Sequence, residues 1–224
     1  MIKIETVLNN EIKIDRKEIF RYLGYKNNTV DEAIVRLAEE CVCKIRDALS
    51  CKACYDRFPV LREEKMLNLG FTDTVSESLS KNLTGCDEIF VFTATIGIDA
   101  DRLINRYSKI SPAHALVMLA AGAVAIEEWC DILCGKLADE ANSEGKFLRP
   151  RFSPGYGDFP IEKQTDIFRV LDCSRKIGVM LTKGLLMIPT KSVSAIIGIS
   201  NEDTKCILSG CEMCSNKNCE FRRI

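Results

Sequence analysis

Histidine is nearly absent from this chain, since its 224 residues include only His114. Ser-His-Asp and Cys-His mechanisms need an imidazole base, so any such mechanism would depend on this one residue. His114 stands in the first turn of an apolar segment that we expect to be helical, where a packed or capping side chain is the simpler interpretation. The sequence therefore argues against nucleophilic catalysis of either type.

The chain also lacks an excess of positive charge and a long hydrophobic run. Its formal net charge is -1 and its pI is about 6.0, so we expect no nucleic-acid partner. The apolar run 113–126 is too short to cross a bilayer, which argues against a membrane partner. No signal-peptide pattern and no strand–G-x-G–helix motif of a Rossmann methyltransferase occur. We expect a soluble, cytoplasmic protein.

Cysteine is abundant, with 12 residues, and the absence of a signal peptide favours thiols or metal ligands over disulfides. Four of them stand in the C-terminal segment with spacings of four, two and four residues: Cys206, Cys211, Cys214 and Cys219. Thiolates prefer Zn²⁺ and iron–sulfur clusters, so these four can converge on one metal. The alternative is a reduced tail that faces solvent. Cys51 and Cys54 form a second, weaker pair.

The segment 149–160, Arg-Pro-Arg-Phe-Ser-Pro-Gly-Tyr-Gly-Asp-Phe-Pro, contains three prolines and two glycines. Proline removes a backbone donor and fixes φ, so we expect a rigid irregular loop that holds Arg151 and Tyr156 in fixed directions. Arginine suits a carboxylate, and the tyrosine ring suits a cation. The loop is therefore a candidate site for a small zwitterion. The alternative is a Pro/Gly-rich connection with solvated arginines.

The pattern of apolar residues predicts a mixed fold. Helices are expected at 12–24, from a capping box at 29–32 onward, and at 73–83, 99–107, 112–140 and 162–171. Strands are expected at 88–96, 178–188 and 192–199, the last with Ser192 and Ser194 on a half-exposed face. Because no regular βαβ repeat occurs, we expect an α+β fold with a twisted antiparallel sheet packed against helices.

The longest expected helix, 112–140, begins at Ser111 with proline at its first position. Its first half is apolar nearly all round, which predicts a central core helix. Glu127 stands where the apolar half ends. Its spacing alone favours a helix-surface charge, and the alternative is a contact with a ligand.

Several motifs together resemble one known family. They are Phe92–Gly97, the 99–107 helix and the core helix through Glu127, then Arg151–Tyr156, Leu181-Thr182, Met187-x-Pro189 and Ser192-Val-Ser194. In this order they resemble the activation (reactivation) domain of cobalamin-dependent methionine synthase, closely over about 75–205 and loosely before. We expect such a domain at 1–205 as a free-standing protein, followed by the cysteine-rich tail 206–224.

The resemblance implies a function. In the family, cobalamin occasionally oxidises to inactive cob(II)alamin, and the activation domain binds S-adenosylmethionine above the corrin while a one-electron donor reduces the cobalt. Methyl transfer then restores methylcobalamin. We therefore expect an accessory protein for a separate corrinoid methyltransferase, such as methionine synthase, which carries the cobalamin. Flavodoxin or ferredoxin is the candidate electron donor.

The resemblance also assigns roles to five residues. It implies that Arg151 binds the carboxylate of S-adenosylmethionine and that Glu127 meets its ammonium group. The backbone of Pro154 and Gly155 would line the adenosyl or methionine part, and Tyr156 would face the sulfonium.

The chain departs from the family pattern in three places. No tyrosine pair stands at 205–207, no counterpart of an N-terminal aspartate is recognised, and cysteines replace the C-terminal helices. We expect the cysteine site to staple the C-terminus or to carry the reducing electron. The alternative functions are an iron–sulfur redox carrier and a zinc-containing module that docks on a corrinoid protein without binding S-adenosylmethionine.

Overall fold

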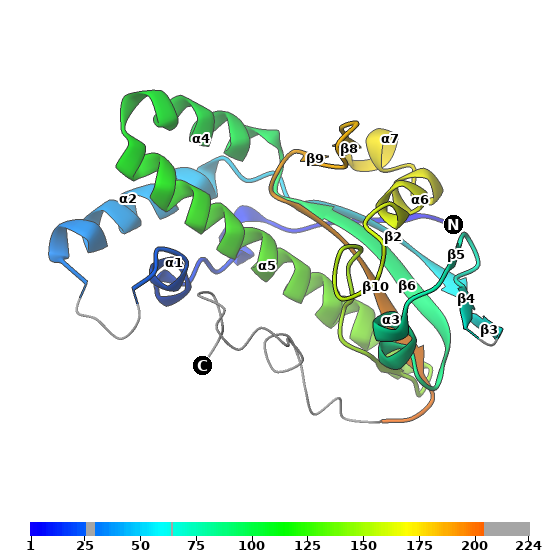
Figure 1. The fold of residues 1–224 in the computed structure, drawn as a ribbon. Coiled ribbons are helices and arrows are strands. Elements are labelled where there is room, and N and C mark those ends of the chain that lie inside the picture. The colour runs from blue at the N-terminus through cyan, green and yellow to red at the C-terminus, as the bar shows by residue number, and fades with distance from the viewer. Residues whose placement is uncertain (26–29, 64, 204–224) are drawn as a thin grey trace.

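A five-stranded antiparallel sheet forms the centre of the protein in a computed structural model that describes residues 1–25, 30–63 and 65–203 (Figure 1). Its strands, in spatial order, are β1 (Lys3–Thr6), β2 (Lys52–Pro59), β6 (Cys86–Thr95), β10 (Ser192–Ser200) and β7 (Phe147–Leu148). Every neighbouring pair runs antiparallel. This sheet and the helices around it confirm the expected α+β class.

One face of the sheet packs against the long helix α5 (Pro112–Ser143), which crosses it obliquely (Figure 1). Three further helices join α5 in this layer: α1 (Arg16–Tyr22), α2 (Glu32–Asp47) and α4 (Ile98–Ile110). Trp129 of α5 is fully buried there, and its indole N–H donates to the Lys52 carbonyl at 3.2 Å. The expected central core helix is therefore confirmed.

The opposite face of the sheet packs against α6 (Lys163–Val170) and α7 (Cys173–Ile177). Side chains alternate between the two faces, as the two-residue period of a strand requires. Ala195 of β10 therefore belongs to the α5 side, and its neighbour Ile196 belongs to the α6–α7 side.

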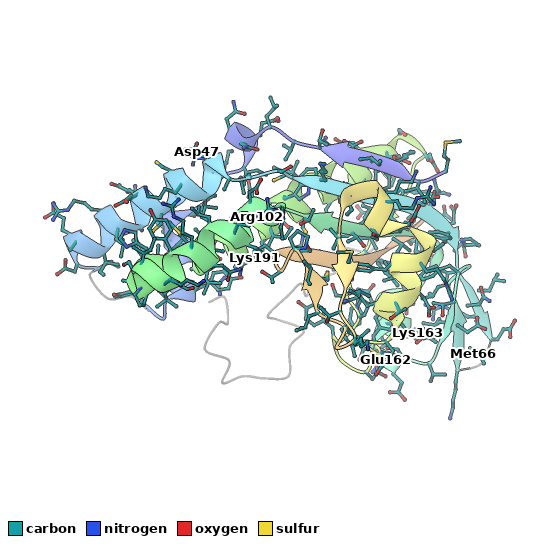
Figure 2. All side chains as sticks on the ribbon, turned by 90° about the horizontal axis from the view of Figure 1, so that it is seen from above. Asp47, Met66, Arg102, Glu162, Lys163 and Lys191 are labelled. Atoms are coloured by element: carbon teal, nitrogen blue, oxygen red, sulfur yellow. The ribbon has the colours of Figure 1, made fainter. Side chains whose placement is uncertain are left out.

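Short elements complete the fold. They are the 3-10 turn Asn9–Glu11, α3 (Glu77–Asn82), a small sheet of β3 (Leu61–Glu63), β4 (Met66–Asn68) and β5 (Asp73–Thr74), and the hairpin of β8 (Met180–Leu181) and β9 (Met187–Ile188). Figure 2 shows that Lys163, at the start of α6, lies at the same end of the molecule as Met66 of β4, and both line a shallow groove. No helix of the described residues is long and apolar enough to cross a membrane.

The structure corrects two expected elements. Thr74 pairs with Leu67 in the small sheet, so the helix expected from residue 73 begins at Glu77, where the Ser76 hydroxyl accepts from the Leu79 amide. The segment 178–188 is a hairpin of two short strands rather than one strand. It turns at Gly184 and at Leu185, whose φ is 60°.

Two local predictions are also wrong. Ser192 and Ser194 are buried rather than half exposed, because they face the side of the sheet that α6 and α7 cover. The N-cap of α2 is Asp31, whose side chain accepts from the Ala33 amide. Thr29, which the capping box proposed for this role, lies outside the described residues.

His114 is a packed side chain, as expected. Its Nδ1 lies 2.8 Å from the Ser111 hydroxyl, and its ring stacks on Tyr107 with the centroids 5.3 Å apart.

Candidate functional site

The Pro/Gly-rich segment 149–160 is an irregular loop attached to the fold at both ends. Near its start, Phe152 exchanges two backbone hydrogen bonds with Ile196 of β10, at 2.8 and 2.9 Å. Near its end, Asp158 accepts hydrogen bonds from the Ser76 hydroxyl and from the amides of Glu77 and Ser78, which are the free donors at the start of α3. These hydrogen bonds lower the pKa of Asp158, so its charged form holds the loop.

Arg151 projects from this loop to α5 and contacts two carboxylates. Its Nη2 lies 2.5 Å from Oε2 of Glu127, and its Nη1 lies 2.7 Å from Oδ1 of Asp131. Glu127 and Asp131 are four residues apart on one helix, so they share a face and can meet the same guanidinium. Glu127 is therefore an ion-pair partner of the loop and not only a charge on the helix surface.

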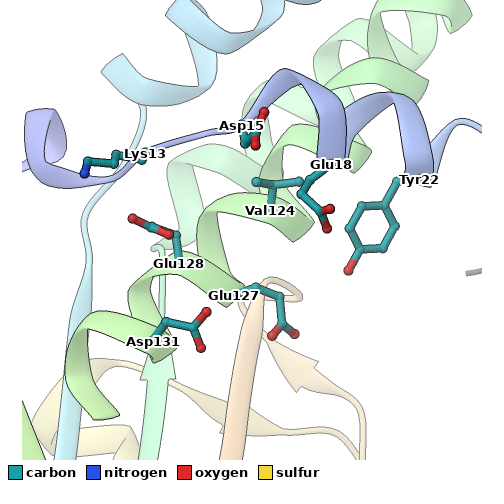
Figure 3. Close-up of a pocket in the computed structure, with 8 residues that line it drawn as sticks. All are labelled: Lys13, Asp15, Glu18, Tyr22, Val124, Glu127, Glu128 and Asp131. Atoms are coloured by element: carbon teal, nitrogen blue, oxygen red, sulfur yellow. The ribbon is translucent and has the colours of Figure 1, made fainter. Parts of the chain in front are cut away.

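A cavity of about 320 Å³ borders this cluster between α1 and α5. The helix α5 contributes Val124, Glu127, Glu128 and Asp131, while the α1 side contributes Lys13, Asp15, Glu18 and Tyr22. Figure 3 shows Glu18 and Tyr22 across the space from Glu127. Five carboxylates and one lysine line the cavity. Arg151 pairs with two of these carboxylates and Arg21 pairs with Glu18, so the remaining net charge is negative and favours a ligand with positive charge.

Tyr156 lies at the edge of the same cluster. Its side chain is 62% exposed, and its ring meets the Phe152 ring edge-on with the centroids 6.3 Å apart. Partial desolvation of the hydroxyl raises the pKa of Tyr156, and the negative charge of Glu127 raises it further. The phenol therefore stays neutral near neutral pH, with its ring available to a ligand.

The structure brings together only part of the expected site. Glu127 and Arg151 are in direct contact, and Tyr156 lies within their electrostatic reach. Pro154 is buried, and Gly155 packs against Ile161 and donates its amide to the Phe159 carbonyl. Neither of these two lines the acidic cavity.

The expected metal site falls outside the part of the chain that the structure describes, because residues 204–224 contain all four tail cysteines. Among the described residues, no group of three or more His, Cys, Asp or Glu side chains could hold a metal ion. Cys51 and Cys54 do not form the second pair, since Cys51 packs on the α5 side of the sheet and Cys54 on the α6–α7 side.

The sequence did not predict five polar residues that line the cavity: Lys13, Asp15, Glu18, Tyr22 and Asp131. A signal existed for Asp131, which stands four residues after Glu127 and therefore on the same helical face. Glu18 and Tyr22 have the same spacing on α1. Nothing in the sequence showed that α1 would pack beside this part of α5.

Comparisons with known proteins agree with this architecture. No curated protein matches the chain by sequence. Among the solved structures that match, the MetH reactivation domain bound to AdoHcy has a TM-score of 0.70 and 16% identity, over 92% of this chain and 80% of that chain. The chain therefore has the same fold as this domain.

The sequence also matches a family model, "Vitamin B12 dependent methionine synthase, activation domain", over residues 25–209. The match includes all the motifs that carried the resemblance and extends it into the N-terminal third. The chain therefore belongs to the family of vitamin B12 dependent methionine synthase activation domains.

Proposed function

We propose that this protein binds S-adenosylmethionine beside Glu127 and Arg151 and serves the reductive remethylation of cob(II)alamin on a corrinoid methyltransferase. The observation that carries the proposal is the contact between the loop arginine and Glu127, which lines the acidic cavity. Membership of the activation-domain family and the fold shared with a domain bound to AdoHcy support it.

The charges of the ligand and of the site are complementary. S-adenosylmethionine carries an ammonium, a sulfonium and a carboxylate. The carboxylate fits the fork of donors on Arg151, and the ammonium fits Glu127, which lines the cavity. In this proposal the exposed Tyr156 ring faces the sulfonium, a contact worth about 1 kcal/mol.

The role of this chain is to hold and orient the methyl donor. The cobalamin belongs to the corrinoid partner, which supplies the cobalt that accepts the methyl group. Pro154 and Gly155 do not line the acidic cavity, so in this proposal their backbone borders only the adenosyl or methionine part that extends along the loop between Arg151 and Tyr156.

The four tail cysteines remain candidate ligands for Zn²⁺ or an iron–sulfur cluster. Metal analysis and absorbance after anaerobic purification separate the two, since a cluster is coloured and zinc is not. A colourless protein with one zinc per chain would contradict a role of this site in carrying the reducing electron. The electron would then come from a flavodoxin or ferredoxin.

Calorimetric titration with S-adenosylmethionine tests the proposal. We expect binding by the unmodified protein and a loss of about 10-fold or more in affinity for Arg151→Met, because a hydrogen bond to a charged group contributes about 1.5–3 kcal/mol. Arg102→Met is the matched control, since Arg102 is exposed on α4 and, among the described residues, forms its ion pair with Asp99.

Two results would contradict the proposal. One is the absence of binding by the unmodified protein. The other is equal affinity of the Arg151→Met and Arg102→Met proteins. Binding to a corrinoid partner without binding of S-adenosylmethionine would favour the alternative of a docking module.

A further inference from the structure

We propose that Asp131 is an internal competitor for the carboxylate of the ligand, so that it weakens binding and reduces the selectivity of the site for ligands that carry this group. The inference rests on the proposed function, because it concerns the same arginine. It adds a residue to which neither the motifs nor the family resemblance gave a role.

The guanidinium of Arg151 is already divided between two carboxylates. Asp131 occupies Nη1 at 2.7 Å and Glu127 occupies Nη2 at 2.5 Å. A carboxylate binds arginine best through two parallel hydrogen bonds to neighbouring N–H groups. Each Nη carries a second N–H group, so donors remain, but a ligand carboxylate at the Nη1–Nη2 edge competes with both side chains for the charge of the guanidinium and for the space beside it.

Asp131 is the side chain that the ligand displaces more easily. Its side chain is 60% exposed, against 37% for Glu127, so water can solvate the released carboxylate. Glu127 in turn lines the cavity and can pair with the ammonium of the ligand after the exchange.

The balance of charge leads to the same conclusion. Arg151, Glu127 and Asp131 together carry a net charge of -1, from one positive and two negative groups. A third carboxylate brought to this arginine makes the cluster more negative, and the repulsion opposes binding. Removal of the charge on Asp131 therefore favours the ligand carboxylate specifically.

Two ligands isolate this effect. S-adenosylhomocysteine carries the carboxylate and ammonium without the sulfonium charge, whereas 5′-methylthioadenosine carries the nucleoside and thioether without the amino-acid groups. We would measure the dissociation constants of both by calorimetry for the unmodified protein, Asp131→Asn and Asp131→Ala. Asp139→Asn is the matched control, since it removes the same charge from an exposed position of the same helix, with no contact to Arg151 among the described residues.

The measured quantity is the preference for S-adenosylhomocysteine over 5′-methylthioadenosine. We expect both Asp131 variants to increase it about two- to five-fold, which corresponds to the strength of an exposed ion pair, while Asp139→Asn leaves it unchanged. An unchanged or decreased preference in the Asp131 variants would overturn this inference alone, because Asp131 would then be inert or would position the arginine. Failure of every protein to bind S-adenosylhomocysteine would overturn the proposed function and this inference with it.

Discussion

Gly157 of the site loop lies against Ser78 of α3, and its replacement by alanine tests how tightly the loop is held. The residue has a φ of 56°, which alanine adopts only with strain. A Cβ atom at this position would lie 2.6 Å from the Ser78 hydroxyl oxygen and 2.9 Å from the Ser78 Cβ. Both distances are far below van der Waals contact, so either the loop or α3 must move.

The expected loss in the free energy of unfolding follows from a comparison with Gly145. This glycine also has a positive φ, 72°, but a Cβ there would meet no atom within 4 Å. Alanine at Gly145 should cost about 1 kcal/mol for the backbone conformation alone. Alanine at Gly157 adds the overpacking against Ser78, about 1–3 kcal/mol, for a total of about 2–4 kcal/mol.

Urea unfolding followed by circular dichroism measures both free energies. The double variant Gly157→Ala with Ser78→Gly removes the atoms that clash, so it should be more stable than the sum of the two single variants predicts. Equal destabilisation by Gly157→Ala and Gly145→Ala would refute the close packing of the loop on α3. The loop could then not hold Arg151 and Tyr156 as described.

Two further predictions concern titratable groups. Partial burial raises the pKa of Glu88, but hydrogen bonds from Lys146 and Arg57 outweigh it and hold that pKa below the ordinary 4.5. The stability that these contacts contribute is present above pH 4.5 and is lost as the pH falls through the lowered pKa of Glu88. The urea midpoint of unfolding should therefore decrease in this acidic range, and it should decrease less for Glu88→Gln. An equal decrease for both proteins would contradict the ion pairs of Glu88. Burial raises the pKa of the Cys130 thiol, so this thiol should react slowly with iodoacetamide in the folded protein. Peptide mass spectrometry should show modification of exposed Cys43 in the folded protein and of Cys130 only after unfolding. Rapid modification of Cys130 in the folded protein would contradict its burial.

The long apolar elements were predictable from the sequence because their pattern has one physical solution. The run 88–96 is too apolar for a surface strand, and it forms β6, the middle strand of the central sheet. The helix that begins at Pro112 shows both an N-terminal signal and a nearly uniform apolar first half, and it forms α5. In both elements the local sequence preference and the burial in the folded protein favour the same secondary structure.

The short elements were not predictable because tertiary contacts determine them. Asp73 and Thr74 have the polar character of a helix start, yet the neighbouring strand β4 draws them into a sheet. The serines of β10 follow the alternation of a half-exposed strand. They are buried because α6 and α7 cover that face, and Ser192 finds hydrogen-bond partners in Thr95 and the Pro189 carbonyl.

The candidate site also has a part that the sequence predicted and a part that only the structure shows. The loop motif predicted Arg151 and Tyr156, because prolines and glycines indicate a rigid irregular loop and these two side chains suit a charged ligand. The partners of Arg151 depended on which face of α5 the loop crosses, and the acidic lining from α1 depended on the packing of two distant helices. Spacing could have suggested Asp131, but only the structure shows that it reaches the same guanidinium as Glu127.

A crystal structure with S-adenosylhomocysteine tests the central claim most directly. We expect the ligand in the space between α1 and α5, with its carboxylate on Arg151, its ammonium near Glu127 and Asp131 turned away from the arginine. A ligand bound elsewhere on the protein, or none at a concentration that saturates calorimetric binding, would contradict the account.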